Sequence, residues 1–227
     1  MMIGVFDSGV GGRFALAELR RLMNKIDTVF YADEKNAPYG SKTAAELEVL
    51  VGSGIERLLS SGAQRVLLAC CTAATVYDRL PSEYRKMSVP IIEPTVLRAA
   101  GLTRGGRIGV LSTEATRRSG VFRDAIMRQG LPEPVCIAAP ELVTLAESGA
   151  ADGHLTDKQR EIIYRAVAPL KEKRVDTVVL GCTHFAYFEQ EITDMLGVAA
   201  VNSARVGAEH IAADIKNEGR GAEIYLR

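Results

Sequence analysis

The sequence predicts an α/β fold made of two similar Rossmann-like lobes, each built on a parallel sheet. Short apolar runs alternate with longer amphipathic segments along the 227 residues, which is typical of β-α-β units. Two pairs of strand-like motifs also echo each other. The stretch "IGVFDS" (3–8) resembles "IGVLST" (108–113), and "RVLLACCTA" (65–73) resembles "DTVVLGCTH" (176–184). This repeat predicts two lobes related by pseudo-symmetry, with the active site in the cleft between them.

The first lobe follows from the order of its apolar runs. A buried strand is expected at 2–7, then a glycine turn that opens a helix over 9–23, and a second strand at 27–33. A long amphipathic helix over 43–62 ends at Gly62, and a third strand follows at 65–70. The polar turn "NAPYGSK" (36–42) follows the second strand, so it should lie at the carboxyl edge of the sheet.

The second lobe repeats the pattern after Glu93-Pro94-Thr95, where a proline interrupts it. Strands are expected at 106–113, 134–140 and 175–182, with helices over 116–130 and 157–173, and the tail at 198–219 adds a strand and a helix. We therefore expect the first lobe to comprise residues 1–95 plus about 205–227, and the second lobe to comprise 96–204.

Composition excludes several classes of function. The 28 basic and 28 acidic residues balance and form no basic block, so nucleic acid is not an expected partner. No apolar run is long enough to span a membrane, and "MMIGVFDSGVGG" lacks the basic region of a signal peptide, so a cytoplasmic protein is expected. The four cysteines should be reduced thiols there, and their spacing from the three histidines does not fit a metal site.

Two of these cysteines, Cys70 and Cys182, end equivalent strands of the repeat. Ligands of open α/β sheets bind beyond the carboxyl ends of the strands, so facing lobes would direct both thiols into one cleft. A helix N-terminus after each strand would favour the thiolate. Two thiols on opposite faces of a substrate suit proton removal and return at one carbon. The alternative is that both are packing residues, since free cysteine is among the most buried residue types.

Other candidates surround these thiols. Asp7 and the glycines that follow open a helix, as in anion sites, although the motif lacks the spacing of dinucleotide and nucleotide-triphosphate loops. Asp7 is either a helix cap or a proton acceptor for a thiol. His184 lies two residues past Cys182 and is either structural or a proton relay. Glu147 lies in the loop-like stretch "LVTLAESG" and, by composition alone, is a solvated carboxylate.

Six motifs in the same order resemble those of the aspartate/glutamate racemase family, and they cover most of the chain. They are "GVFDSGVGG" (4–12), "YADEKNAPYGSK" (31–42), "LLACCTAAT" (67–75), "IGVLSTEAT" (108–116), "LVTLAESG" (142–149) and "DTVVLGCTHF" (176–185). The resemblance implies a racemase without a cofactor, acting on glutamate or aspartate through two thiols. It further implies a cytoplasmic homodimer that makes D-glutamate for peptidoglycan in the cell wall.

The resemblance also implies roles for particular residues. Cys70 would deprotonate the D-enantiomer with help from Asp7, and Cys182 the L-enantiomer with help from His184 and Glu147. A further set would hold the carboxylates and ammonium of the substrate: Ser8, Pro38, Tyr39, Gly40, Ser41, Cys71, Thr72, Thr113, Thr116 and Thr183.

Three departures from the family pattern keep other functions open. Cys71 stands where the family has asparagine, Asn202 stands where it has aspartate, and the chain is shorter than is usual. A thiol is a weaker donor and acceptor than an amide. One alternative is a related decarboxylase or isomerase acting on another carboxylate. The other is a non-catalytic protein that binds an acidic metabolite.

Overall fold

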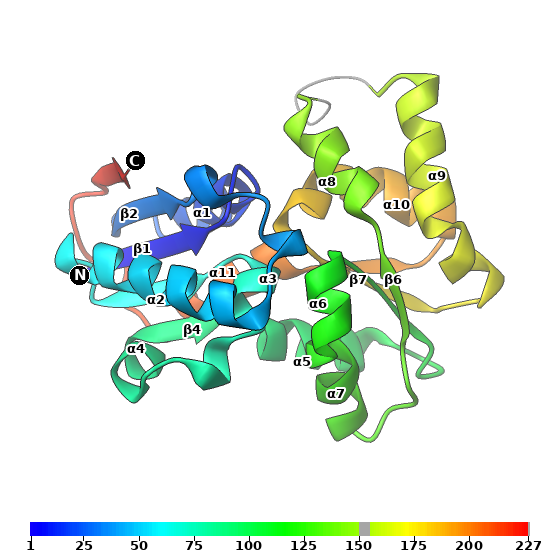
Figure 1. The fold of residues 1–227 in the computed structure, drawn as a ribbon, viewed down its shortest axis with the longest axis horizontal. Coiled ribbons are helices and arrows are strands. Elements are labelled where there is room, and N and C mark those ends of the chain that lie inside the picture. The colour runs from blue at the N-terminus through cyan, green and yellow to red at the C-terminus, as the bar shows by residue number, and fades with distance from the viewer. Residues whose placement is uncertain (150–154, 227) are drawn as a thin grey trace. The chain divides into compact units, whose positions relative to one another are not determined.

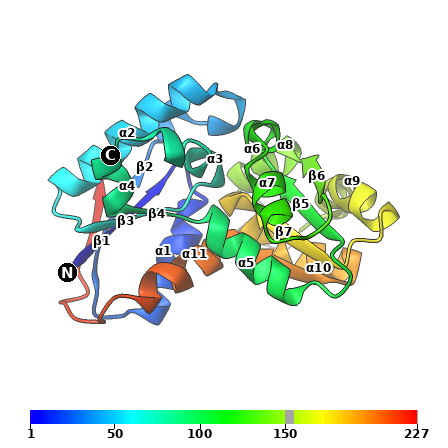
Figure 2. The same cartoon turned by 90° about the horizontal axis from the view of Figure 1, so that it is seen from below.

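The computed structural model describes residues 1–149 and 155–226, and the chain divides into two compact units. The first unit comprises Met1–Ile91 and Ala204–Arg227, and the second comprises Ile92–Ser203. Figure 1 shows the ribbon coloured along the chain, and Figure 2 shows it from below. Both units combine helices with one parallel sheet, which confirms the predicted α/β class.

The sheet of the first unit has five parallel strands in the order β4-β3-β1-β2-β9. Figure 2 shows it between α2 on one side and α1 and α11 on the other. The elements are β1 Met2–Asp7, α1 Gly12–Leu22, β2 Asp27–Ala32, α2 Ala44–Ser60, β3 Arg65–Leu68, α3 Cys71–Ala74, α4 Ser82–Met87, β4 Ser88–Pro90, α11 Ser203–Ala213 and β9 Glu223–Leu226, with 3₁₀ turns at Glu34–Asn36, Tyr39–Ser41 and Tyr77–Arg79.

Helix α2 shows how sequence builds this unit. Thr43 and Glu46 form a capping box at its start, which satisfies backbone donors that the first turn leaves open. Its apolar residues recur every three or four positions, and Leu47, Val51 and Ile55 are fully buried against the sheet. This packing fixes the sheet that carries the first thiol.

The sheet of the second unit has four parallel strands in the order β6-β5-β7-β8. Its buried core joins α8, α9 and α10 to β7, while α5 packs against β7 and β8. The elements are α5 Ile92–Leu102, β5 Ile108–Ser112, α6 Glu114–Ser119, α7 Val121–Arg128, β6 Val135–Ala138, α8 Pro140–Glu147, α9 Asp157–Glu172, β7 Thr177–Gly181, α10 Glu189–Leu196 and β8 Ala199–Asn202, with a 3₁₀ turn at Thr183–Phe188.

The repeated motifs occupy equivalent positions in the two sheets. Strand β1 lies between β3 and β2, and strand β5 lies between β7 and β6. The motif strand β3 therefore neighbours β1 in the same way that β7 neighbours β5. The prediction of two similar parallel-sheet lobes is confirmed at the level of strand order.

Two details of the predicted elements were wrong. The single helix expected over 116–130 is two helices, α6 and α7, because Gly120 adopts a φ of 71° that ends a right-handed helix. Pro94 does not interrupt the secondary structure, because it lies in the first turn of α5, where a backbone N–H would have no acceptor within the helix.

The C-terminal strand β9 was not predicted. It pairs in parallel with β2, and its entry is fixed by the carboxylate of Asp27, which accepts backbone N–H groups of Arg220 and Ala222 at 3.1 and 2.8 Å. Most of its side chains are exposed. A strand without a buried apolar face leaves little signal in its sequence.

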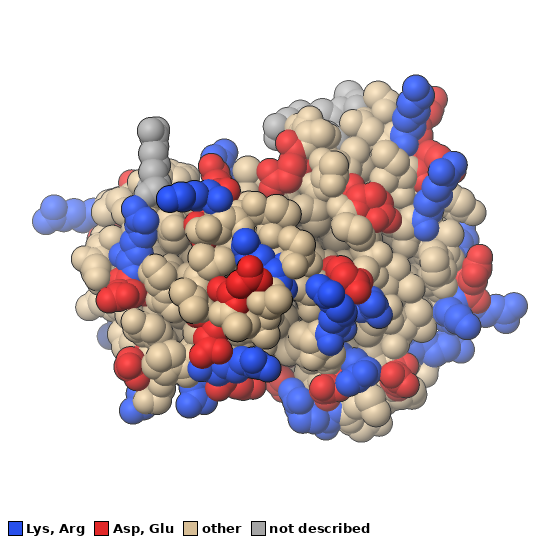
Figure 3. Space-filling model, in the orientation of Figure 1, with Lys and Arg blue, Asp and Glu red and all other residues tan. Residues whose placement is uncertain are grey.

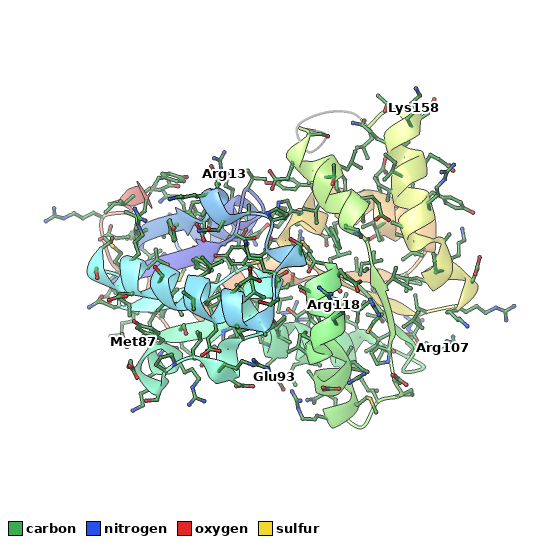
Figure 4. All side chains as sticks on the ribbon, in the orientation of Figure 1. Arg13, Met87, Glu93, Arg107, Arg118 and Lys158 are labelled. Carbon is green, nitrogen blue, oxygen red and sulfur yellow. The ribbon has the colours of Figure 1, made fainter. Side chains whose placement is uncertain are left out.

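The molecular surface carries mixed charge. On the face drawn in Figure 3, basic and acidic side chains are interspersed. Figure 4 labels several of these exposed side chains, including Arg13 on α1, Arg118 on α6 and Lys158 on α9. Among residues 1–149 and 155–226, no helix has the length and apolar character needed to cross a membrane.

Candidate active site

The first half-site lies at the carboxyl edge of the five-stranded sheet. Asp7 ends β1, and Cys70 follows β3 as the N-cap of the short helix α3. The Sγ of Cys70 lies 3.4 Å from the Oγ of Ser8 and accepts the backbone N–H of Ala73 at 3.5 Å. The structure thus brings Ser8 and Cys70 into hydrogen-bond contact, as a shared site requires.

Asp7 is fully buried beside this thiol. Its Oδ1 accepts the backbone N–H of Gly9 at 2.9 Å, so it also caps the glycine turn. A Cβ at Gly12 would lie 2.3 Å from the Cβ of Asp7, so the turn needs glycine there to pack against the carboxylate. From this one position, Asp7 can both cap the turn and accept a proton from the nearby Cys70 thiol.

Burial, and after it the negative charge of Asp7, raise the pKa of the Cys70 thiol to about 11, although hydrogen bonds from Ser8 and Ala73 lower it in part. This corrects the expectation that a helix N-terminus would favour the thiolate. Helix α3 has only four residues, so its field is too weak to offset the loss of hydration. At neutral pH the resting group is a neutral thiol.

The raised pKa predicts a loss of stability in alkali. Below pH 9 both the folded and unfolded chains carry the proton, so this contribution is fully present. Between pH 9 and about 11 only the unfolded chain loses it, and the free energy of unfolding should fall by about 2–3 kcal/mol. Urea unfolding across this range should show a fall that is larger by this amount in the wild type than in Cys70→Ser, because other groups with raised pKa values, such as Cys136, remain in both proteins. Parallel pH profiles for the two proteins would contradict the assignment.

The polar turn 36–42 follows β2 at the same edge, as predicted. Its 3₁₀ turn Tyr39–Ser41 contacts α3, and the peptide bond before Pro38 is cis. Tyr39 is only 1% exposed and donates its hydroxyl to Asp33 Oδ2 at 2.7 Å, whereas Gly40 and Ser41 lie nearer the surface. Ser41 donates to the carbonyl of Pro38 at 3.4 Å. Tyr39 thus uses its hydroxyl within the protein, and the sequence reasoning missed Asp33.

The second half-site lies at the carboxyl edge of the four-stranded sheet. Cys182 directly follows β7, and His184 lies in the 3₁₀ turn after it. The Sγ of Cys182 is 3.7 Å from the Nδ1 of His184, and the Nε2 of His184 is 2.5 Å from Glu147 Oε1. Glu147 is the last residue of helix α8 and not part of a loop, as its sequence had suggested. The three side chains form one continuous chain of contacts.

Glu147 is the solvent-exposed end of this chain of contacts. Cys182 and His184 are buried, with the His184 side chain 6% exposed, while the Glu147 side chain is 44% exposed. A proton on the buried thiol therefore has a route through the imidazole to a carboxylate that reaches solvent.

The remaining predicted binding residues are buried polar groups at the same edges. Thr113 follows β5 and caps α6, accepting the N–H of Thr116 at 3.3 Å, and the two hydroxyls lie 3.0 Å apart. Thr72 and Cys71 form the first turn of α3, and Thr183 follows Cys182. Each is at most 7% exposed. These groups lie at the carboxyl ends of β3, β5 and β7, at the same two sheet edges as the thiols.

Asn202 has a structural partner that accounts for its type. Its Nδ2 donates to Glu189 Oε2 at 2.8 Å, and the adjacent Ser203 donates to the carbonyl of Leu180 at 2.7 Å. An aspartate at position 202 would place a second carboxylate against Glu189, which costs free energy when both are charged. Asn202 therefore matches Glu189, a residue that the sequence reasoning had not singled out.

The chemistry available at these half-sites is acid–base. All four cysteines are free thiols. In the described part of the chain, no three His, Cys, Asp or Glu side chains come together as metal ligands. What the residues offer is a thiol with a proton-accepting neighbour in each of the two units.

Comparison with known proteins gives a consistent family. The model of the family described as Asp/Glu/Hydantoin racemase matches residues 18–211. The glutamate racemase of Aquifex aeolicus is 34% identical over 229 residues, covering 100% of this chain and 88% of that protein. That of Gloeobacter violaceus is 37% identical over 217 residues, covering 94% of this chain and 80% of that protein.

Solved structures agree with this comparison. The glutamate racemase of Aquifex pyrophilus superposes with a TM-score of 0.82 at 31% identity, over 98% of this chain and 87% of that one. Glutamate racemase isoform RacE1 of Bacillus anthracis gives a TM-score of 0.87 at 26% identity, over 99% and 86%. The chain belongs to the Asp/Glu/Hydantoin racemase family, whose members are isomerases that work without pyridoxal phosphate.

Proposed function

We propose that this protein interconverts L- and D-glutamate by a 1,1-proton transfer between two thiols. The observation that carries the proposal is a buried thiol at the carboxyl edge of each of two equivalent sheets, with the buried carboxylate of Asp7 near Cys70 and the imidazole of His184 3.7 Å from Cys182. Relatives that bear the name glutamate racemase support glutamate as the substrate. The proposed product, D-glutamate, would serve peptidoglycan synthesis.

The proposed reaction needs one thiolate and one thiol at a time. With D-glutamate bound, the Cys70 thiolate takes the α-proton, and the electron pair of the broken C–H bond remains as a carbanion delocalised into the carboxylate. The Cys182 thiol then gives its proton to the opposite face and becomes a thiolate. The reverse sequence converts L-glutamate. Asp7 would accept the proton that Cys70 must lose beforehand, and the substrate ammonium would lower the pKa of that thiol.

His184 and Glu147 would restore Cys182 between turnovers. After conversion of D-glutamate, Cys182 lacks a proton and Cys70 carries one, so both must exchange protons before the next D-enantiomer reacts. The path from Cys182 through His184 to the exposed Glu147 supplies the second thiol from solvent. We propose that the pair also assists Cys182 during the proton-transfer step, because it accepts the proton of the thiol when Cys182 must act as the base for L-glutamate.

The difficult step is carbanion formation, because the α-hydrogen of an amino acid is very weakly acidic. Preorganised donors around the substrate carboxylate would stabilise the charge that develops there. Buried hydroxyls of Thr72, Thr113 and Thr183, with backbone N–H groups at the helix starts, are suitable donors. We propose that Ser8, Gly40, Ser41 and Thr116 complete this set.

Cys71 provides a test of glutamate as the substrate. It is 1% exposed and is the first residue of α3, directly after Cys70. The family resemblance implies asparagine at this position. We expect Cys71→Asn to raise kcat/KM for glutamate about ten-fold, because an amide adds a hydrogen bond to a charged substrate. Cys71→Ser is the matched control. An unchanged or lower kcat/KM in a folded Cys71→Asn protein would count against glutamate.

The direct assay of the proposed function is chiral chromatography of pure D- or L-glutamate after incubation with the protein. The opposite enantiomer should form without added pyridoxal phosphate, and in the presence of a metal chelator. D- and L-aspartate serve as competing substrates. Retention of optical purity by both glutamate enantiomers would overturn the proposal, and inversion of aspartate alone would make aspartate the substrate.

A further inference from the structure

Asp33 lies directly after β2 and gathers the side chains of the turn that follows it. Its Oδ2 accepts the hydroxyl of Tyr39 at 2.7 Å and the amide of Asn36 at 3.0 Å. Its Oδ1 accepts the same amide at 2.9 Å and the hydroxyl of Tyr31 at 3.3 Å. Asp33 is 4% exposed, so this carboxylate is held by protein donors in place of water.

The same residue is fixed to the first half-site through its backbone. The N–H of Asp33 donates to the carbonyl of Asp7 at 2.9 Å, continuing the β1–β2 ladder beyond its last paired residues. Tyr39 belongs to the buried cluster that contains Cys70 and Phe6, and its ring centroid lies 6.3 Å from that of Phe6. Asp33 therefore connects the backbone beside Asp7 to a ring that packs near the thiol.

We infer that Asp33 is a positioning residue for the substrate-binding turn 36–42. By anchoring Tyr39 and Asn36 on either side of Pro38, it would hold the backbone of Gly40 and Ser41 where a substrate carboxylate is received. Tyr39 then acts through its ring and its place in the turn, with its hydroxyl committed to Asp33. This inference rests on the proposed function for its substrate, while the anchoring itself is a property of the fold.

The carboxylate is needed because it offers only acceptors. Asn36, Tyr39 and Tyr31 are all donors toward it, and both oxygens are used. An asparagine at position 33 keeps the size but presents one NH2 group to a donor. Burial and the nearby Asp33 charge both raise the pKa of Tyr39, which keeps its hydroxyl a donor.

The test is a double-mutant cycle of Asp33→Asn and Tyr39→Phe in the racemase assay. We expect Asp33→Asn to raise KM for glutamate about ten-fold with a much smaller change in kcat, and Tyr39→Phe to raise it less. The double variant should be no worse than Asp33→Asn alone, because both changes remove one shared interaction. Glu34→Gln removes an exposed carboxylate one residue further on and should leave KM unchanged.

Hydrogen exchange of the backbone gives a readout that does not depend on the substrate. In Asp33→Asn, amides of residues 36–42 should exchange faster, while those of α9 in the other unit should not change. An unchanged KM, or faster exchange spread over both units, would overturn the inference. If the wild type fails to racemise glutamate while the exchange result holds, the proposed function fails and the anchoring role of Asp33 stands.

Discussion

Replacing either Cys70 or Cys182 by serine is expected to lower racemisation of glutamate by roughly 10²–10⁴-fold, the typical value of a positioned acid–base group. Serine keeps the shape of the side chain, but its hydroxyl is a far weaker acid than a thiol. It can neither form the required base nor return a proton with comparable ease. Chiral chromatography of each enantiomer after incubation measures the loss.

Two controls make this result specific. Cys136→Ser changes a thiol on β6 outside both half-sites and should retain full activity. Unfolding curves should show that the Cys70 and Cys182 variants remain folded at neutral pH. A fully active single variant at either position would refute the two-thiol assignment. If the wild type instead leaves glutamate unchanged and turns over another carboxylate with only one of the two thiols required, a related decarboxylase or isomerase is favoured.

Breaking the path from Cys182 to solvent is expected to give the second largest effect. His184→Asn should lower kcat/KM by about 10²-fold, and Glu147→Gln should lower it less, since it leaves the imidazole in place. The two enantiomers have equal free energies in solution, so kcat/KM must fall by the same factor in both directions. The value of kcat/KM therefore cannot show which of the two thiols His184 assists, and a different measurement is needed.

Isotope effects provide that direction dependence. In His184→Asn, removal of the α-proton of L-glutamate by Cys182 becomes slower, so the α-deuterium isotope effect on kcat/KM should increase for the L-enantiomer. For D-glutamate, Cys70 still breaks the C–H bond, and slow reprotonation at Cys182 now limits the rate, so the isotope effect should decrease.

The matched control on the same helix is Glu141→Gln, which removes an exposed carboxylate in the first turn of α8. It should leave both isotope effects at wild-type values. Equal changes for D- and L-glutamate in His184→Asn would contradict the assignment of this pair to Cys182 alone.

Much of the fold was predictable because apolar periodicity reports buried elements directly. The strands at 2–7 and 27–33 were placed within a residue, since each is a short apolar run whose central side chains are buried. Strand β9 was missed because its partner β2 lies far away in sequence and its own side chains are exposed. The break at Gly120 was missed because a positive φ ends the helix there, although the helical periodicity of the sequence continues through this residue.

The candidate site was predictable only as far as strand ends and the family resemblance indicate it. Cys70 and Cys182 follow strands, so their places at a sheet edge were expected. The contact between His184 and Glu147 joins residues that lie 37 positions apart, so no local sequence pattern encodes it. The raised pKa of Cys70 depends on burial, which a neighbouring helix N-terminus had seemed to offset. Asp33 was missed because a lone carboxylate after a strand is usually a solvated residue.

The measurement that tests the central claim most directly is deuterium incorporation into D-glutamate in D2O with the reduced protein, followed from the first turnovers by chiral chromatography and proton NMR of each separated enantiomer. Two opposed thiols predict that L-glutamate appears with deuterium at its α-carbon while the remaining D-glutamate still carries its proton. The same should hold with the enantiomers exchanged. If the starting enantiomer gains deuterium faster than it inverts, one base serves both faces and the account is wrong. If no α-proton exchanges at all, the protein does not perform proton transfer on glutamate.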